Sequence, residues 1–287
     1  MNRRQFVIKS SQAAALLSVL PTFACSSQKG ISSGVFNDFG IQLWTLRDII
    51  YANPKETIQQ IGKMGFTQIE SFEGNQGIFW GMQPKEFKSF LDGEGLNFVS
   101  SHCNWKENLA QKAADVASIG GKYLICPWLG PQKSIDDFKR YADEFNKAGE
   151  ICKKEGVRFA YHNHDYSFQL LEGQIPQQIF LDNTDSELVD FEMDIYWVVT
   201  AGIDPIEYMT NYKNRFRLCH IKDRNKNTTE AFDSCTLGEG MIDYGSILTK
   251  AKALGMEYFI YEQEKYNDKG VIVNAKESSE YLKKMKL

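Results

Sequence analysis

The sequence has no excess of positive charge. Its 287 residues include 33 Lys and Arg against 37 Asp and Glu, a formal net charge of -4 at pH 7. Phosphate backbones and anionic membranes bind basic surfaces, so neither nucleic acid nor a membrane surface is an expected partner. The composition, with 43% apolar and 24% charged residues, is typical of a globular protein. A small molecule is therefore the expected partner.

Paired cysteines are also missing. After the first 30 residues the chain has five cysteines, none in a C-x-x-C pair: Cys103, Cys126, Cys152, Cys219 and Cys235. An odd number cannot pair completely within one chain, so the sequence favours neither a disulfide framework nor a zinc ribbon. We expect buried free thiols instead.

Residues 1–30 have the layout of an export signal followed by a tether. Arg3 and Arg4 precede a short apolar stretch at 13–20. This stretch is shorter than the roughly 20 residues that span a bilayer. The arginine pair resembles a twin-arginine signal, and Cys25 resembles the acylated cysteine of a lipoprotein, although an ordinary signal-peptidase site is the alternative. We expect an exported, periplasmic protein, tethered to a membrane if Cys25 is acylated.

Residues 36–287 repeat one pattern, a short run of β-branched and aromatic residues followed by a segment of helical periodicity. The expected strands are 40–45, 66–72, 96–102, 122–128, 157–163, 188–194, 215–222 and 257–263. Eight such units favour a single (β/α)8 TIM barrel over an open doubly wound sheet. No G-x-G-x-x-G follows the first strand and no P-loop occurs, which also argues against the open sheet.

Ionisable side chains gather at the carboxyl ends of the expected strands, where a barrel of this kind assembles its site. They include all four histidines of the chain: Glu70, His102, His162, His164, Asp194, His220, Lys222, Glu262 and Glu264. Residues two apart on a strand share a face, so these side chains can point inward together. A mixed shell of imidazole nitrogens and carboxylate oxygens suits Mn²⁺, Co²⁺, Zn²⁺ or Fe²⁺ better than Ca²⁺.

Six motifs along the body resemble the xylose-isomerase-like barrel family of sugar isomerases and epimerases, which also includes endonuclease-IV-type enzymes. They are GIQLWTLRD from Gly40, AYHNHDYSF from Ala160, EMDIYWVVTAGIDP from Glu192, CHIKD from Cys219, LGEGMIDY from Leu237 and IYEQE from Ile260. The resemblance implies one divalent metal, held by side chains from strands five to eight. Mn²⁺ is the expected ion, with Co²⁺, Zn²⁺, Fe²⁺ or Mg²⁺ as alternatives.

Carried over by motif, the resemblance makes Asp194, His220 and Glu262 metal ligands. The fourth position departs from the family pattern, because His162 stands where many relatives have the glutamate of E-N-H. Since the strand-five and strand-eight glutamates are the acid and base of the epimerases, only Glu262 of that pair remains. Trp197 stands where epimerases often have a substrate-binding histidine, and its ring offers a flat apolar face to a sugar.

The chemistry implied is removal of a proton next to a carbonyl to give an enediolate, followed by isomerisation, epimerisation or elimination. Elimination from a keto-glycoside would cleave its glycosidic bond. Glu262 and His164 are the candidate bases, and Lys222 is the candidate group for stabilising negative charge. The residues expected to bind the sugar are Glu70, His102, Trp44 and Trp197.

Export favours a free sugar or a keto-glycoside over a sugar phosphate as substrate, because sugar phosphates are cytoplasmic metabolites. Two alternatives stay open. A sugar-binding lipoprotein without catalysis is suggested by the missing strand-five glutamate. A nuclease of the endonuclease-IV type is disfavoured, because it needs a multi-metal cluster and a basic surface. The sequence leaves the sugar and the oligomeric state undetermined.

Overall fold

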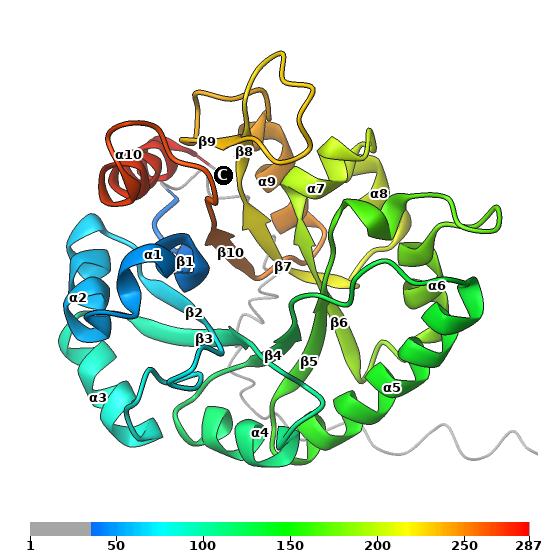
Figure 1. The fold of residues 1–287 in the computed structure, drawn as a ribbon, viewed down its shortest axis with the longest axis horizontal. Helices are drawn as coiled ribbons and strands as arrows, with labels where there is room; N and C mark the ends of the chain where they lie inside the picture. The colour runs from blue at the N-terminus through cyan, green and yellow to red at the C-terminus, as the bar shows by residue number, and fades with distance from the viewer. Residues whose placement is uncertain (1–35, 287) are drawn as a thin grey trace, which may run out of the picture. The chain divides into compact units, whose positions relative to one another are not determined.

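The computed structural model describes residues 36–286 and folds them into a closed barrel of eight parallel strands. Around the barrel the strands follow the order β1-β10-β7-β6-β5-β4-β3-β2 (Figure 1). Their bounds are β1 Gly40–Gln42, β2 Gln68–Phe72, β3 Asn97–His102, β4 Tyr123–Cys126, β5 Arg158–His162, β6 Val189–Asp194, β7 Phe216–Ile221 and β10 Tyr258–Tyr261. The (β/α)8 fold expected from the sequence is confirmed. The expected export signal and Cys25 lie outside the described residues.

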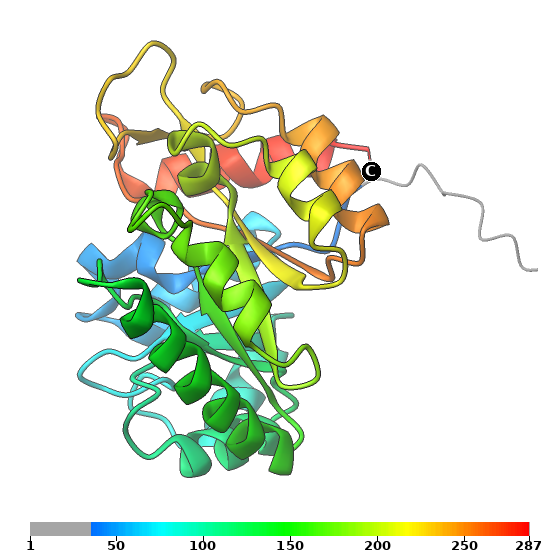
Figure 2. The same cartoon turned by 90° about the vertical axis from the view of Figure 1, so that its right-hand side faces the viewer.

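Helices alternate with the strands and cover the outside of the barrel (Figure 2). They are α1 Arg47–Ile50, α2 Pro54–Met64, α3 Pro84–Gly93, α4 Leu109–Ser118, α5 Ile135–Lys154, α6 Pro176–Asn183, α7 Ile195–Thr200, α8 Pro205–Asn211, α9 Tyr244–Ala253 and α10 Val271–Lys284, with 3₁₀ turns at Leu43–Leu46 and Asp165–Phe168. A small antiparallel hairpin, β8 Asp223–Arg224 with β9 Ser234–Cys235, follows β7 and was not expected. Within the described part, no helix is both long and apolar enough to cross a membrane.

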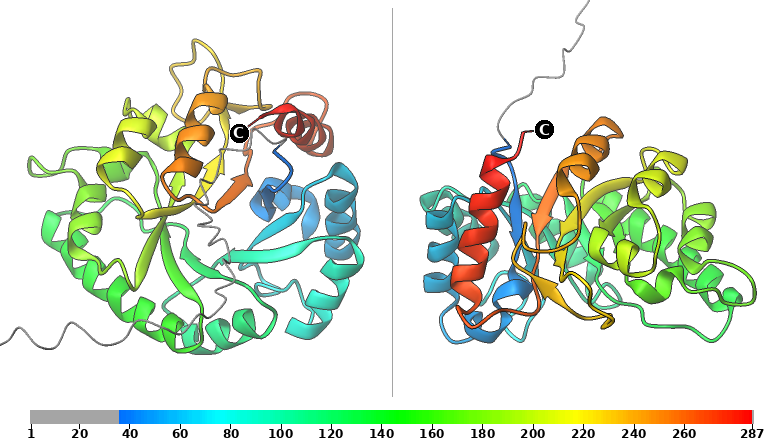
Figure 3. Two further views of the ribbon diagram at one scale, coloured as in Figure 1. Left: turned by 180° about the vertical axis from the view of Figure 1, so that it is seen from behind. Right: turned by 90° about the horizontal axis from the view of Figure 1, so that it is seen from above.

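Gly65 ends a helix that lies beside the last helix of the chain. It follows α2 with a φ of +93°, a conformation that favours glycine. Nζ of Lys283 donates to the carbonyl of Met64 at 2.6 Å. Ser279 also donates to that carbonyl, at 2.8 Å. The final helix α10 therefore packs beside α2 and closes the ring of helices (Figure 3).

Strand β5 is anchored from outside the barrel by fully buried aromatic rings. Phe159 and Tyr161 of β5 pack against Phe145 of α5 and Phe180 of α6, with ring centroids 4.8 to 5.4 Å apart. Burying each such ring contributes about 1.5–3 kcal/mol. Because side chains alternate along a strand, this outward packing fixes His162 on the inner face.

The inside of the barrel is filled in layers. At the bottom, Tyr123 and Arg158 both donate to Asp190 on β6, at 3.0 Å each. An apolar plug lies above, formed with Tyr123 by Val99, Ile125, Ala160 and Leu218. The next inward-facing positions on β2, β3, β5, β6, β7 and β10 are ionisable. Carboxylates and imidazoles thus lie directly on an apolar layer, where an unpaired charge would be costly.

Candidate active site

The carboxyl ends of the strands open into a cavity of about 840 Å³. Trp44, Trp105, Trp128 and Trp197, which follow four different strands, are among its lining residues. Ligand pockets commonly measure about 300–1,000 Å³. The cavity therefore has room for a sugar-sized molecule and flat apolar faces for its rings.

The four side chains expected to bind a metal converge at the floor of this cavity. We call them the upper set: His162, Asp194, His220 and Glu262. Nε2 of His162 lies 3.4 Å from Oδ2 of Asp194. Nδ1 of His220 lies 3.2 Å from Oε2 of Glu262 and 3.8 Å from Oδ2 of Asp194. None of the four residues is more than 3% exposed.

Lys222 places an ammonium group among the carboxylates of the upper set. Its Nζ lies 2.9 Å from Asp194 Oδ2 and 2.7 Å from both Glu262 Oε2 and Glu264 Oε2. Burial lowers the pKa of Lys222, but the three carboxylates outweigh burial and raise it well above the usual value. Burial raises the pKa of Glu262, but the charges of Lys222 and His220 hold it well below its usual value. Glu262 is therefore ionised and a weak base in this arrangement.

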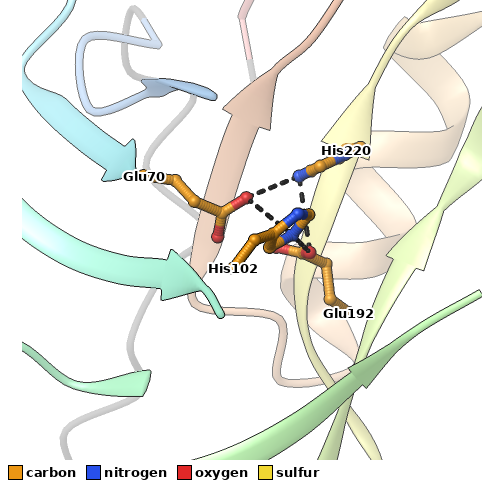
Figure 4. A group of neighbouring side chains, drawn as sticks. All are labelled: Glu70, His102, Glu192 and His220. Carbon is orange, nitrogen blue, oxygen red and sulfur yellow. Dashed lines mark hydrogen bonds and ion pairs between the residues drawn. The ribbon is translucent and has the colours of Figure 1, made fainter. Parts of the chain in front are cut away.

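A second group of side chains lies one step deeper, which we call the lower cluster: Glu70, His102, Glu192 and His220. Figure 4 shows the four pointing toward one another from β2, β3, β6 and β7. His220 Nε2 lies 2.6 Å from Glu70 Oε1, and His102 Nε2 lies 2.8 Å from Glu192 Oε2. His102 Nε2 also lies 3.3 Å from Glu70 Oε1, and His220 Nε2 lies 3.4 Å from Glu192 Oε2. His220 belongs to both groups, through Nδ1 above and Nε2 below.

The two carboxylates of the lower cluster differ in their surroundings. Burial raises the pKa of Glu70, but the charges of His102 and His220 outweigh it and lower the pKa to about 2. Burial and then the charge of Glu70 raise the pKa of Glu192 to about 7. Glu70 also accepts hydrogen bonds from Gln42 and Ser100, whereas Oε1 of Glu192 has no donor among the described residues.

His162 and His164 are held as neutral imidazoles. Burial and then neighbouring positive charge lower the pKa of both well below the usual value. In the part of the chain that the structure describes, Nδ1 of each is buried without a hydrogen-bond partner. Neutral rings of this kind can act as metal ligands or as proton acceptors. His164 also lines the cavity, with its ring 4.5 Å from that of Trp128.

The expected sugar-binding residues occupy different positions. Trp44 is 40% exposed at the cavity wall, whereas Trp197 is 6% exposed and packs near His164. His102 lines the cavity. Glu70 is fully buried and absent from the lining, so the structure places it under His102 and His220.

Sequence reasoning missed Glu192 as a site residue. The signal was present, because Glu192 precedes Asp194 by two residues and alternation puts both on one face of β6. Glu264 was noted only as a strand-end acid, two residues beyond Glu262. Its bond to Lys222 depends on the course of the chain after β10, which strand alternation alone does not predict.

Asp223 of the CHIKD motif is bound by the backbone rather than turned toward the cavity. It accepts from the backbone N–H groups of Arg224, Gly238, Gly240 and Ile242, at 2.8 to 3.2 Å. A Cβ at Gly240 would lie 2.1 Å from Oδ1 of Asp223. The LGEGMIDY motif thus wraps around Asp223 and stabilises the loop that follows β7.

Comparison with known proteins gives one family match and several relatives. A family model described as xylose isomerase-like TIM barrel matches residues 58–285. An inosose dehydratase of Clostridium perfringens is 30% identical over 145 residues, which are 50% of this chain and 45% of the relative. That of Geobacillus kaustophilus is 25% identical over 185 residues, 58% of this chain and 59% of the relative. The chain thus spans less than two thirds of the length of these curated relatives.

Among solved structures, a sugar phosphate isomerase/epimerase from Parabacteroides distasonis is 28% identical and has a TM-score of 0.75. The match covers 86% of this chain and 98% of that chain. The agreement therefore extends over almost the whole barrel.

Proposed function

We propose that this chain, which belongs to the xylose isomerase-like TIM barrel family, is a divalent-metal-dependent enzyme that removes a proton next to a sugar carbonyl. The proposed substrate is a free sugar or a keto-glycoside, and the outcome is isomerisation, epimerisation or elimination. The relatives named inosose dehydratase and sugar phosphate isomerase/epimerase support this class of reaction. The upper set at the floor of an aromatic-lined cavity is the observation that carries the proposal.

The upper set fits a divalent ion such as Mn²⁺, with Co²⁺, Zn²⁺, Fe²⁺ or Mg²⁺ as alternatives. His162, Asp194, His220 and Glu262 would hold it with two imidazole nitrogens and two carboxylates, a donor set suited to these transition metals. The neutral His162 ring supports the fit, because a metal-ligating imidazole must be unprotonated at the binding nitrogen. When bound, the ion supplies Lewis-acid polarisation of the substrate carbonyl and the neighbouring hydroxyl.

His164 is the proton acceptor that the surroundings favour over Glu262. Both side chains line the cavity, but Nδ1 of His164 has no partner among the described residues, whereas the Glu262 carboxylate is bound by Lys222 and His220. Lys222 stabilises negative charge that develops on the substrate oxygens. Return of the proton to another carbon or face gives isomerisation or epimerisation, and loss of a leaving group from the next carbon gives elimination.

The remaining lining residues orient the sugar. His102 is placed to hydrogen-bond a hydroxyl from the cavity floor. Trp44 and Trp197 present rings against which a sugar face can stack.

Turnover in D₂O tests the proposal. The protein is loaded with Mn²⁺ and incubated with a panel of ketoses and 3-keto-glucosides, and solvent deuterium entering the carbon next to the carbonyl is measured by NMR. We expect exchange with at least one substrate, and loss of metal in the Asp194→Ala and His220→Ala variants. Absence of turnover and exchange across the panel, or full metal occupancy in either variant, would contradict the proposal.

A sugar-binding protein without catalysis is the second candidate. The observation that favours it is His162 at the position where relatives have a catalytic glutamate, together with the ion-paired state of Glu262. Isothermal titration calorimetry separates the two, because tight sugar binding with no deuterium exchange is expected of the binding protein alone.

We also propose that the protein is exported and tethered through Cys25. The twin-arginine-like start and the cysteine after the apolar stretch support this. Fractionation of cells expressing the full chain and the Cys25→Ser variant tests it. We expect the full chain in the membrane fraction and the variant in the soluble periplasmic fraction, and equal partitioning of both would contradict a tether.

A further inference from the structure

We propose that the lower cluster of Glu70, His102, Glu192 and His220 is a second divalent-metal site, distinct from the upper set. The cluster joins two carboxylates and two imidazoles from four strands, and the four ligand atoms all lie within 4.8 Å of one another. None of the four residues is more than 6% exposed. Two imidazoles with two carboxylates are a donor set that Zn²⁺, Co²⁺ and Mn²⁺ accept.

The spacing of the donor atoms is close to that of a tetrahedral shell. Zinc binds imidazole nitrogens and carboxylate oxygens at about 2.0–2.2 Å, which separates neighbouring ligands of a tetrahedron by about 3.4 Å. Two of the nitrogen-to-oxygen distances in the cluster are 3.3 and 3.4 Å, and the other two are 2.6 and 2.8 Å. The side chains need only small outward movements to surround an ion.

Glu192 supplies a second and independent observation. Its Oε1 is buried and has no hydrogen-bond donor in the described part of the chain. Its other oxygen lies 2.8 Å from Nε2 of His102. A buried carboxylate oxygen without a donor is costly, and a metal ion would bind it.

The number of carboxylates in the whole site also favours a second metal ion. Five carboxylates lie together, namely Glu70, Glu192, Asp194, Glu262 and Glu264, none with a side chain more than 13% exposed. In the described part of the chain, Lys222 is the one Lys or Arg side chain that they contact. The carboxylates therefore outnumber the Lys and Arg side chains of the site five to one, and a metal ion would add positive charge among them.

The two sites would share His220, with Nδ1 directed to the upper set and Nε2 to the lower cluster. Access is available because His102 lines the cavity. The proposal rests on the proposed function only in treating the upper set as a metal site of its own.

Metal counting on the purified full-length chain tests the proposal. The protein is stripped with a chelator, dialysed against Co²⁺ or Zn²⁺, and metal per chain is measured by inductively coupled plasma mass spectrometry. We expect two ions in the wild type and one in the His102→Asn and Glu192→Gln variants. The His162→Asn and Glu262→Gln variants should also hold one, retained in the lower cluster, and His220→Asn should weaken both sites.

Asp190→Asn is the matched control, because Asp190 lies on the same face of β6 but bonds Arg158 and Tyr123 at the barrel bottom. This variant should keep two ions. The ion kept by His102→Asn and Glu192→Gln shows that these variants are folded. One ion in the wild type and one in each of His102→Asn and Glu192→Gln would overturn the proposal. The lower cluster would then consist of two hydrogen-bonded carboxylate–imidazole pairs without a metal ion. Absence of deuterium exchange would count against the proposed reaction and would leave this metal count unaffected.

Discussion

Nζ of Lys222 lies 2.7 Å from Oε2 of Glu262, the residue expected to be both metal ligand and base. The same ammonium contacts Asp194 and Glu264, so one buried cation compensates three carboxylates. A divalent ion in the upper set would neutralise two of these same carboxylates. Lys222 and such an ion would therefore act on a common set of charges.

Replacing Lys222 with methionine should make the stability of the protein depend on metal. Breaking a buried ion pair by removing one partner costs about 3–5 kcal/mol. Added Mn²⁺ should recover part of this loss, so that it raises the melting temperature more in Lys222→Met than in the wild type. Thermal unfolding with and without Mn²⁺ measures the effect.

Lys88→Met is the control for that experiment, because Lys88 forms an exposed pair with Asp92 on α3. Such a pair is worth at most about 1 kcal/mol, so the control should resemble the wild type. If Mn²⁺ raises the melting temperature of Lys222→Met no more than that of the wild type, Lys222 and the metal ion do not compensate the same carboxylates.

Trp128 should contribute to sugar binding and little to stability. Its side chain is 56% exposed at the cavity, and its ring packs edge-on against His164 and Tyr166. We expect Trp128→Ala to raise the sugar dissociation constant about tenfold, which corresponds to about 1.4 kcal/mol. Calorimetric titration with a bound member of the sugar panel, together with urea unfolding, measures both quantities.

Trp80, in contrast to Trp128, should contribute mainly to stability. It is 3% exposed, packs against Phe72 and donates to Ser71 at 3.1 Å. Trp80→Ala should therefore cost about 3–5 kcal/mol of unfolding free energy. Unchanged sugar affinity in Trp128→Ala would exclude that ring from the binding surface.

The fold was predictable because its signals are local and repeated. Each strand run and each helix-ending glycine, such as Gly65 or Gly156, can be recognised within about ten residues. Eight such strand–helix repeats are compatible with few architectures, of which the closed barrel is the one favoured. The β8–β9 hairpin escaped prediction because its strands are two residues each and depend on Asp223, whose backbone donors lie up to 19 residues away.

The candidate site was predictable as a set of strand-end residues but not as a network. Alternation brings Asp194 and Glu262 inward, yet it does not show that Lys222 lies between them. Nor does it show that Glu70 points under His220, since that contact joins residues 150 apart in the sequence. Such distances follow from barrel closure and side-chain packing rather than from any sequence pattern.

Asp223 should be a strong determinant of stability without taking part in chemistry. Each of its four backbone hydrogen bonds is made to a charged acceptor, and such bonds contribute about 1.5–3 kcal/mol each. We expect Asp223→Ala to lower the unfolding free energy by at least about 3 kcal/mol in urea. Gly240→Ala should be destabilised as well, because its Cβ would meet the Asp223 carboxylate.

Asp243 is the matched control for Asp223. It caps the start of α9 by accepting from Ser246, and loss of a helix cap costs about 1 kcal/mol. Asp243→Ala should therefore lose much less unfolding free energy than Asp223→Ala. Equal losses in the two alanine variants would show that the loop after β7 does not depend on Asp223.

The thiols of the barrel should be unreactive until the protein unfolds. All five cysteines of the described part are free and buried. Burial raises the pKa of Cys126 and Cys152 to about 12, so about one such thiol in ten thousand is ionised at pH 8. Because the thiolate is the reactive form, we expect the Cys25→Ser chain to show no fast reaction with a thiol reagent at pH 8, and five reactive thiols in urea. Two thiols have some access: Cys235 is 9% exposed, and Cys103, which lines the cavity, is 3% exposed. Any slow reaction in the native state should therefore disappear in the Cys103→Ser, Cys235→Ser double variant, and rapid native reaction at another cysteine would contradict the packing described for the barrel.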